Sequence, residues 1–131
     1  MKALFAAFML ILVVALPVFA ECAEMKINEM VITSKIVKGK PIDSIKRLSS
    51  STDKNLYCYT RITAPVGTDS HIKHLWYRGD EKTGEQRLPV KGEQWRTYSS
   101  KNIRKGLAGD WRVEAVDDSG ALLKIVKFRM N

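Results

Sequence analysis

Beyond residue 23 the apolar side chains come in short runs that often alternate with polar ones, and Gly, Pro, Asp, Asn and Ser separate the runs. Alternation puts every second side chain on the same face, which is the period of a β-strand. Residues 56–63 are the clearest case, because Leu56, Cys58, Thr60 and Ile62 share one face that we assign to the core. Seven or eight such strands predict an all-β fold, an antiparallel β-sandwich of the immunoglobulin-like kind, with a small barrel as the alternative.

Turn-forming residues set the expected bounds of the strands. A long, bent first strand over 25–37 is expected to end at Gly39-Lys40-Pro41, and residues 41–54 form a surface connection or an edge segment. The polar stretch 79–85 predicts a hairpin loop, and Pro89 confines the returning strand to a sheet edge because proline donates no hydrogen bond. The other expected strands cover 56–63, 71–78, 86–90, 95–99, 110–116 and 121–130, with loops at 64–70 and 101–109 and a hairpin turn at 117–120.

The N-terminal segment has the pattern of a secretion signal: Lys2, an apolar run over 3–14, and the small-residue ending Val18-Phe19-Ala20. It predicts a helical signal peptide over 1–20, cleaved after Ala20, and a single domain over 21–131 that is periplasmic or secreted. The alternative is an uncleaved segment that tethers the domain to the inner membrane, because a spanning helix needs about 20 apolar residues. Export removes nucleotide cofactors and genomic DNA from the expected partners.

Charge and cysteine content narrow the expected chemistry further. The formal net charge is +8, which favours anionic partners such as acidic polymers, lipid head groups or acidic proteins, although scattered lysines also keep a small protein soluble. Cys22 and Cys58 are able to form a disulfide in an oxidising compartment, but Cys58 on a core-facing strand position equally fits a buried free thiol. Glu21 occupies a position where a lipobox before Cys22 has a small residue, so lipidation is not expected.

Three segments resemble one bacterial family. They are His74-Leu75-Trp76-Tyr77-Arg78, Trp95-Arg96-Thr97-Tyr98-Ser99-Ser100-Lys101, and Gly109-Asp110-Trp111-Arg112-Val113-Glu114 with Asp118, Gly120 and Leu122. Together they resemble the domain of unknown function family 2914, whose members show a His-x-Trp strand, an Arg-Thr-aromatic-Ser-x-Lys segment and a Gly-x-Trp-x-Val strand before a hairpin. Lys40-Pro41 and Leu56-Tyr57-Cys58-Tyr59 also match, so the resemblance extends over residues 21–131. It implies one domain and brings no established activity.

Each tryptophan has an arginine close behind it, and this pattern marks the candidate ligand-binding residues. Trp76 and Arg78 share a strand face with His74 and are able to stack, whereas buried tryptophans are also ordinary core anchors of a sandwich. Hydroxyls and positive charge next to Trp95 suit a carboxylate, phosphate or sulfate. The residues predicted to bind a ligand are His74, Trp76, Arg78, Trp95, Arg96 and Lys101.

His74 lacks the companions that catalysis or metal binding needs. His71 is three residues away, hence on the opposite strand face, and the chain has no nucleophile motif. We expect His74 to pack beside Trp76 and to hydrogen-bond Ser99, Thr97 or a backbone group. The sequence therefore predicts no enzymatic activity, no cofactor and no metal, but a module that binds an anionic or glycan component of the envelope. The alternative is a protein-interaction domain that docks on a larger envelope assembly.

Overall fold

The computed structural model describes residues 11–14 and 24–131, in which all regular structure is β-strand. The strands are β1 (Lys26–Thr33), β2 (Ile36–Val37), β3 (Lys40–Pro41), β4 (Arg47–Leu48), β5 (Lys54–Thr63), β6 (Ser70–Arg78), β7 (Glu81–Val90), β8 (Gln94–Ile103), β9 (Gly109–Asp117) and β10 (Leu122–Met130). No helix of the described residues is long and apolar enough to cross a membrane.

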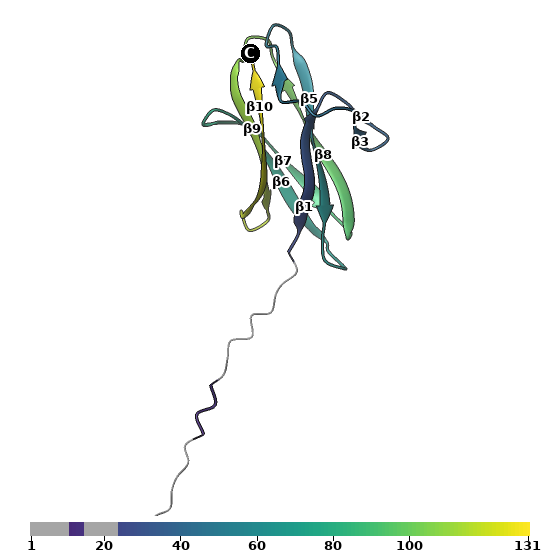
Figure 1. The fold of residues 1–131 in the computed structure, drawn as a ribbon, viewed down its shortest axis with the longest axis vertical. Helices are drawn as coiled ribbons and strands as arrows, with labels where there is room; N and C mark the ends of the chain where they lie inside the picture. The colour runs from purple at the N-terminus through teal and green to yellow at the C-terminus, as the bar shows by residue number, and fades with distance from the viewer. Residues whose placement is uncertain (1–10, 15–23) are drawn as a thin grey trace, which may run out of the picture.

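Two sheets face each other as a sandwich (Figure 1). One has the order β1-β5-β8, the other has the order β4-β10-β9-β6-β7, and β2 and β3 form a small separate ribbon. All pairs are antiparallel except β4 with β10. The predicted antiparallel sandwich is confirmed and the barrel alternative is wrong. The strand number is ten in the described chain, not seven or eight, because three strands of two residues escape detection by alternation.

The expected long first strand over 25–37 is divided into β1 and β2. β1 stops at Thr33, and the chain then forms the β2–β3 hairpin, which turns at Lys38 and Gly39 with φ values of 51° and 73°. The break occurs where the carboxylate of Asp43 accepts hydrogen bonds from the Ser34 amide at 2.9 Å and the Ser34 hydroxyl at 2.6 Å. These bonds lower the pKa of Asp43. They direct the chain away from the sheet and hold the hairpin in place.

Two expected loops are in fact strand. The turn after β6 consists of Gly79 and Asp80 alone, so the polar residues 81–85 belong to β7, where their charged side chains face solvent from an edge strand. The returning strand does lie at a sheet edge, as Pro89 predicts. Residues 101–103 extend β8, because Ile103 pairs with Lys54 at the far end of β5. The loop between β8 and β9 is correspondingly shorter.

The core between the sheets follows the predicted strand faces. Leu56, Cys58, Thr60 and Ile62 are all at most 1% exposed. On the facing sheet Trp111 stacks on Phe128 with ring centroids 6.0 Å apart, and Trp76 meets the same phenyl ring edge-on at 6.3 Å. An aromatic cluster therefore anchors the five-stranded sheet to its partner.

Two sequence predictions fall largely on residues that are not described. Of the predicted signal peptide only residues 11–14 are described, without helix, and Ala20 and Cys22 lie outside the described ranges. The cleaved helical signal and the Cys22–Cys58 disulfide therefore stay predictions. Within the described residues the sulfur of Cys58 has no disulfide partner and is fully buried, and burial raises the pKa of this thiol. A thiol of this kind is unreactive while the domain is folded.

Candidate functional site

His74 and Trp76 lie inside the sandwich. Both side chains are at most 1% exposed, and the imidazole of His74 bridges the two sheets. Its Nε2 atom lies 2.8 Å from the hydroxyl of Thr60, its Nδ1 atom lies 2.6 Å from the hydroxyl of Ser99, and Trp76 Nε1 donates to the same Ser99 oxygen at 3.1 Å. Burial lowers the pKa of His74 to about 4. The expected packing beside Trp76 and bond to Ser99 are confirmed, and this burial removes both residues from any exposed surface.

Arg78 and Lys101 come together at a different place. With Arg104 and Trp111 they line a hollow of about 260 Å³ at the end of the sandwich where β6 stops. Arg78 donates from Nε to the carbonyl of Ala108 at 2.8 Å, and Lys101 donates from Nζ to the carbonyl of Thr83 at 2.6 Å. These two cations therefore hold a loop and the neighbouring edge strand in position.

Trp95 and Arg96 lie in a third place. The indole of Trp95 packs against the core, while Arg96 faces solvent from the opposite side of β8. Together with Arg61 and Gln94 they line a hollow of about 500 Å³. The six predicted residues thus fall into three groups, and only the group of Arg96 opens onto a broad outer face of a sheet.

That outer face belongs to the sheet β1-β5-β8, and we name it the tyrosine–arginine face after Tyr57, Arg61, Arg96 and Tyr98. Tyr59 also points to this side of β5 but is covered, with only 2% of its surface exposed. Arg61 lies directly opposite Arg96, and Tyr59 lies directly opposite Tyr98. The rings of Tyr57 and Tyr98 meet edge-on with centroids 5.8 Å apart, and Tyr98 is 48% exposed. Aromatic rings and guanidinium groups therefore sit side by side, about 7 Å apart along each strand.

The charge on this face is not balanced. Arg61 Nε lies 3.5 Å from a carboxylate oxygen of Glu29, whereas within the described ranges Arg96 has no acidic partner. Lys40 and Pro41 of the β2–β3 hairpin line a second hollow of about 320 Å³, which shares the two arginines with the first. Like charges directly opposite each other in a sheet destabilise it. Within the described chain, the repulsion between Arg61 and Arg96 is therefore offset only by the ion pair of Arg61 with Glu29.

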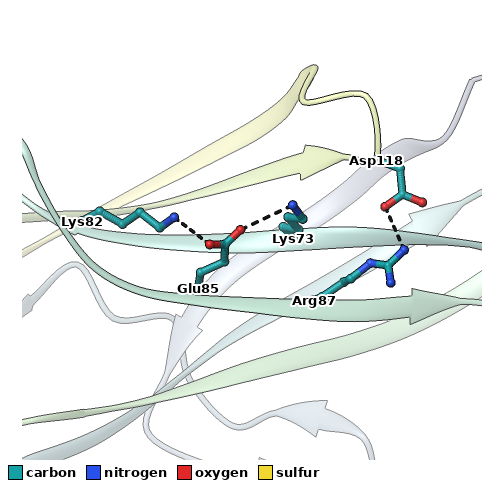
Figure 2. Close-up of polar contacts among 5 residues, drawn as sticks. All are labelled: Lys73, Lys82, Glu85, Arg87 and Asp118. Atoms are coloured by element: carbon teal, nitrogen blue, oxygen red, sulfur yellow. Dashed lines mark hydrogen bonds and ion pairs between the residues drawn. The ribbon is translucent and has the colours of Figure 1, made fainter.

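On the outer face of the other sheet, near its β7 edge, the basic side chains form ion pairs (Figure 2). Glu85 accepts Lys82 at 2.7 Å and Lys73 at 3.5 Å, and Asp118 from the β9–β10 turn lies 3.5 Å from Arg87. The ammonium group of Lys82 holds the pKa of Glu85 below its ordinary value. Each of the three cations drawn in Figure 2 lies within 3.5 Å of one of two carboxylates, so the cations of this region are ion-paired, unlike Arg96 in the described part of the chain.

Sequence reasoning missed most of the tyrosine–arginine face. The alternation over 56–63 already placed Tyr57, Tyr59 and Arg61 on the face opposite to the core. The missing information was the pairing of β5 with β8, which places Arg61 against Arg96. Lys40 was also missed, because its place depends on the hairpin that Asp43 secures.

Comparisons with solved structures identify the fold. The chain is similar to an immunoglobulin-like protein from Pseudomonas aeruginosa, with a TM-score of 0.54 and 11% identity over 83% of this chain and 98% of that chain. It is also similar to the CARDB domain of a Pyrococcus furiosus protein, with a TM-score of 0.56 and 8% identity over 83% of this chain and 95% of that one. At these identities the likeness shows an immunoglobulin-like fold and nothing about the ligand.

The family comparison covers the second half of the domain. No curated protein matches the sequence. The model of a family described as "Protein of unknown function (DUF2914)" matches residues 69–130, which run from β6 to β10. The further likenesses at Lys40-Pro41 and at Leu56-Tyr57-Cys58-Tyr59 lie before this match. Residues 69–130 thus match the DUF2914 family, whose function is unknown, and the described chain has an immunoglobulin-like fold.

Proposed function

We propose that this protein is an exported, non-enzymatic immunoglobulin-like domain that binds an anionic glycan of the bacterial envelope on its tyrosine–arginine face. The observation that carries the proposal is the cross-strand pair Arg61 and Arg96, of which Arg61 has an ion pair with Glu29 while Arg96 has no acidic partner among the described residues. Guanidinium groups present planar donors that match a carboxylate or sulfate in two parallel hydrogen bonds. Lys40 adds a further cation at the rim of the same site.

The tyrosines beside the arginines favour a sugar over a simple ion. A tyrosine offers an apolar ring face together with a hydroxyl, and a sugar ring offers the complementary combination of C–H groups and hydroxyls. Tyr98 is half exposed and is braced from the side by Tyr57. The site therefore combines an apolar platform with charge, and the ligand class that uses both is a glycan that carries acidic groups.

Replacing Arg96 with glutamine is expected to weaken binding to polygalacturonate about tenfold, because a hydrogen bond to a charged group contributes about 1.5–3 kcal/mol. Arg87→Gln is the matched control, since it removes the same charge from the other sheet. Tyr98→Ala is expected to weaken binding without any change in net charge. Calorimetric titration at low and at high salt measures these effects, and the affinity of the unaltered protein should fall as salt rises.

The same variants distinguish a binding residue from a structural one. Removal of Arg96 relieves the repulsion with Arg61, so Arg96→Gln should leave the free energy of unfolding unchanged or raise it by a few tenths of a kcal/mol. Equal losses of affinity for Arg96→Gln and Arg87→Gln point to unspecific charge attraction and contradict the proposal. Binding of neutral dextran as strongly as polygalacturonate contradicts it as well.

The second candidate function is docking on a larger envelope assembly, and one feature of β10 favours it. β4 pairs with β10 at Arg129 and Met130 alone, so within the described sheets residues 122–127 of β10 have one unpaired edge. Leu122 and Ile125 on this strand are 52% and 38% exposed. An unpaired edge can accept a strand from another protein. Recovery of a stable protein partner by crosslinking, together with no affinity for acidic glycans, favours this function over glycan binding.

Export is tested on the chain itself. We expect the protein from bacterial cells to occur in the periplasmic fraction or the medium. Its measured mass should be that of a chain that begins at Glu21, because residues 1–20 have the pattern that signal peptidase cleaves after Ala20. Mass spectrometry of the fractionated protein measures this. An uncleaved chain in the inner-membrane fraction supports the tethered alternative, and a full-length chain in the cytosol contradicts export.

A further inference from the structure

We propose a second anion site, specific for phosphate groups, in the groove over β4, β9 and β10. Lys46 and Arg47 line it from one side, Arg112 lines it from β9, and Lys127 and Arg129 line it from β10, around a volume of about 610 Å³. These five cations share the groove with the carboxylates of Asp80 and Asp110, and a third carboxylate, that of Glu114, lies next to Arg112. This inference is independent of glycan binding, because it uses none of the residues of the tyrosine–arginine face.

Two of these arginines are already held by neighbours. Arg129 Nη1 lies 2.8 Å from Asp110 Oδ1. Arg112 lies 4.1 Å over the ring of Tyr77, and its Nε atom is 3.3 Å from a carboxylate oxygen of Glu114. Both guanidinium groups are thereby oriented before a ligand arrives, which lowers the entropic cost of binding.

The other three cations have no such partner. Within the part of the chain that the structure describes, Lys46, Arg47 and Lys127 form no ion pair. They surround the groove together with the two oriented arginines. An anion that enters the groove therefore meets positive charge that the protein itself does not neutralise.

The short strand β4 is what creates this concentration of charge. Its two residues pair with the end of β10, so that Arg47 is the register partner of Arg129. The Arg129 amide donates to the Lys46 carbonyl at 2.9 Å, and the Asn131 amide donates to the Leu48 carbonyl at 2.8 Å. Adjacent like charges oppose this pairing. A bound anion stabilises it.

Phosphate suits this groove better than a carboxylated sugar does. A phosphate monoester or diphosphate carries more than one negative charge and several acceptor oxygens, and arginine and lysine bind these strongly. Trp111 and Phe128 line the groove but are only 2% and 4% exposed, so they offer no open ring face for a sugar. Recognition here rests on charge and hydrogen bonds.

The two sites lie at different places on the domain. Arg61 is paired with Glu29 near the middle of β1, whereas the groove lies at the end of β10, next to the C-terminus (Figure 1). They also lie on the outer faces of different sheets. Both can therefore be occupied at once, and the domain can link a phosphate-bearing partner to a second anionic one.

The test uses the domain over residues 21–131, inorganic pyrophosphate as the probe, and the double variant R47Q/K127Q. We expect saturable shifts of backbone amide resonances in β4, β9 and β10 of the unaltered protein, and an affinity at least about tenfold lower in the variant, which loses two charge-assisted contacts. The double variant K73Q/R87Q removes the same charge, one lysine and one arginine, from residues that line neither site, and it should bind pyrophosphate like the unaltered protein. Thermal unfolding checks that each variant is folded.

Vesicles separate the possible sources of the phosphate group. Co-sedimentation with phosphatidylglycerol vesicles, lost on addition of pyrophosphate and absent with phosphatidylcholine, assigns the groove to lipid headgroups. Pyrophosphate binding without vesicle binding assigns it to a soluble phosphate. Equal weakening in R47Q/K127Q and K73Q/R87Q, resonance shifts outside the groove, or no binding of either probe overturns the proposal. If the protein fails to bind glycans but binds pyrophosphate in the groove, the phosphate site is supported and only the proposed glycan binding is contradicted.

Discussion

Replacing Trp111 with alanine is expected to lower the free energy of unfolding by about 3–5 kcal/mol, which is the range for removal of a fully buried large aromatic side chain. Trp111 is 2% exposed and stacks on Phe128. Its Nε1 atom also donates to the Leu107 carbonyl at 3.1 Å, which fixes the loop between β8 and β9. The substitution removes the stack, the hydrogen bond and the volume that fills the centre of the sandwich.

Denaturant unfolding measures this effect, and two further variants keep the prediction testable if the alanine variant does not fold. Trp111→Phe keeps an aromatic ring against Phe128 but loses the bond to Leu107, so a loss of about 1–2 kcal/mol is expected. Trp95→Ala removes an indole that is only partly buried, and its cost should be clearly smaller. A larger loss for Trp95→Ala than for Trp111→Ala contradicts the assignment of Trp111 as the main anchor of the core.

Alternation along the sequence was sufficient to predict which faces of the long strands are buried. It placed Trp111, Val113 and Ala115 on one face of a strand, and all three are at most 2% exposed. The reason is physical: a sandwich buries one face of each sheet, and a shift of one residue would expose the whole apolar set. Strands of two residues, such as β4, have no period to detect.

The candidate sites were harder to predict, because they depend on cross-strand register and on side chains from distant segments. Tryptophan next to arginine in the sequence proved a poor guide, since Trp76 and Arg78 end up in the core and at the end of the sandwich respectively. The pairing of Arg61 with Arg96 and of Arg47 with Arg129 joins segments that are far apart in the chain. Charge repulsion across these pairs is visible only once the register is known.

Acidification is expected to destabilise the domain through His74. The pKa of His74 is lowered from 6.5 to about 4 by burial, so between these values the unfolded chain takes up a proton that the folded domain excludes. Stability is therefore complete above pH 6.5 and falls as the pH drops toward 4. This difference between the pKa values of the folded and the unfolded chain lowers the free energy of unfolding by about 3 kcal/mol near pH 4.

Burial of the imidazole excludes the proton from the folded domain, and the hydrogen bonds around the neutral ring are complete without it. Ser99 accepts from Trp76, so its own hydroxyl proton is available for His74 Nδ1, and His74 Nε2 then donates to Thr60. In this arrangement every group has a partner. A proton on Nδ1 would face the hydroxyl proton of Ser99, and the charge would lie between two dry sheets.

Comparison of variants isolates this contribution from that of the carboxylates. His74→Gln should lower stability at neutral pH but remove the decline between pH 6.5 and 4, so that the difference from the unaltered protein shrinks on acidification. His71→Gln, which changes a partly buried histidine of the same strand, should leave the decline in place. Asp43 and Asp117 have lowered pKa values, so their contributions are lost at more acidic pH and are common to all three proteins. A decline of equal slope in His74→Gln would show that the buried imidazole does not control the acid sensitivity.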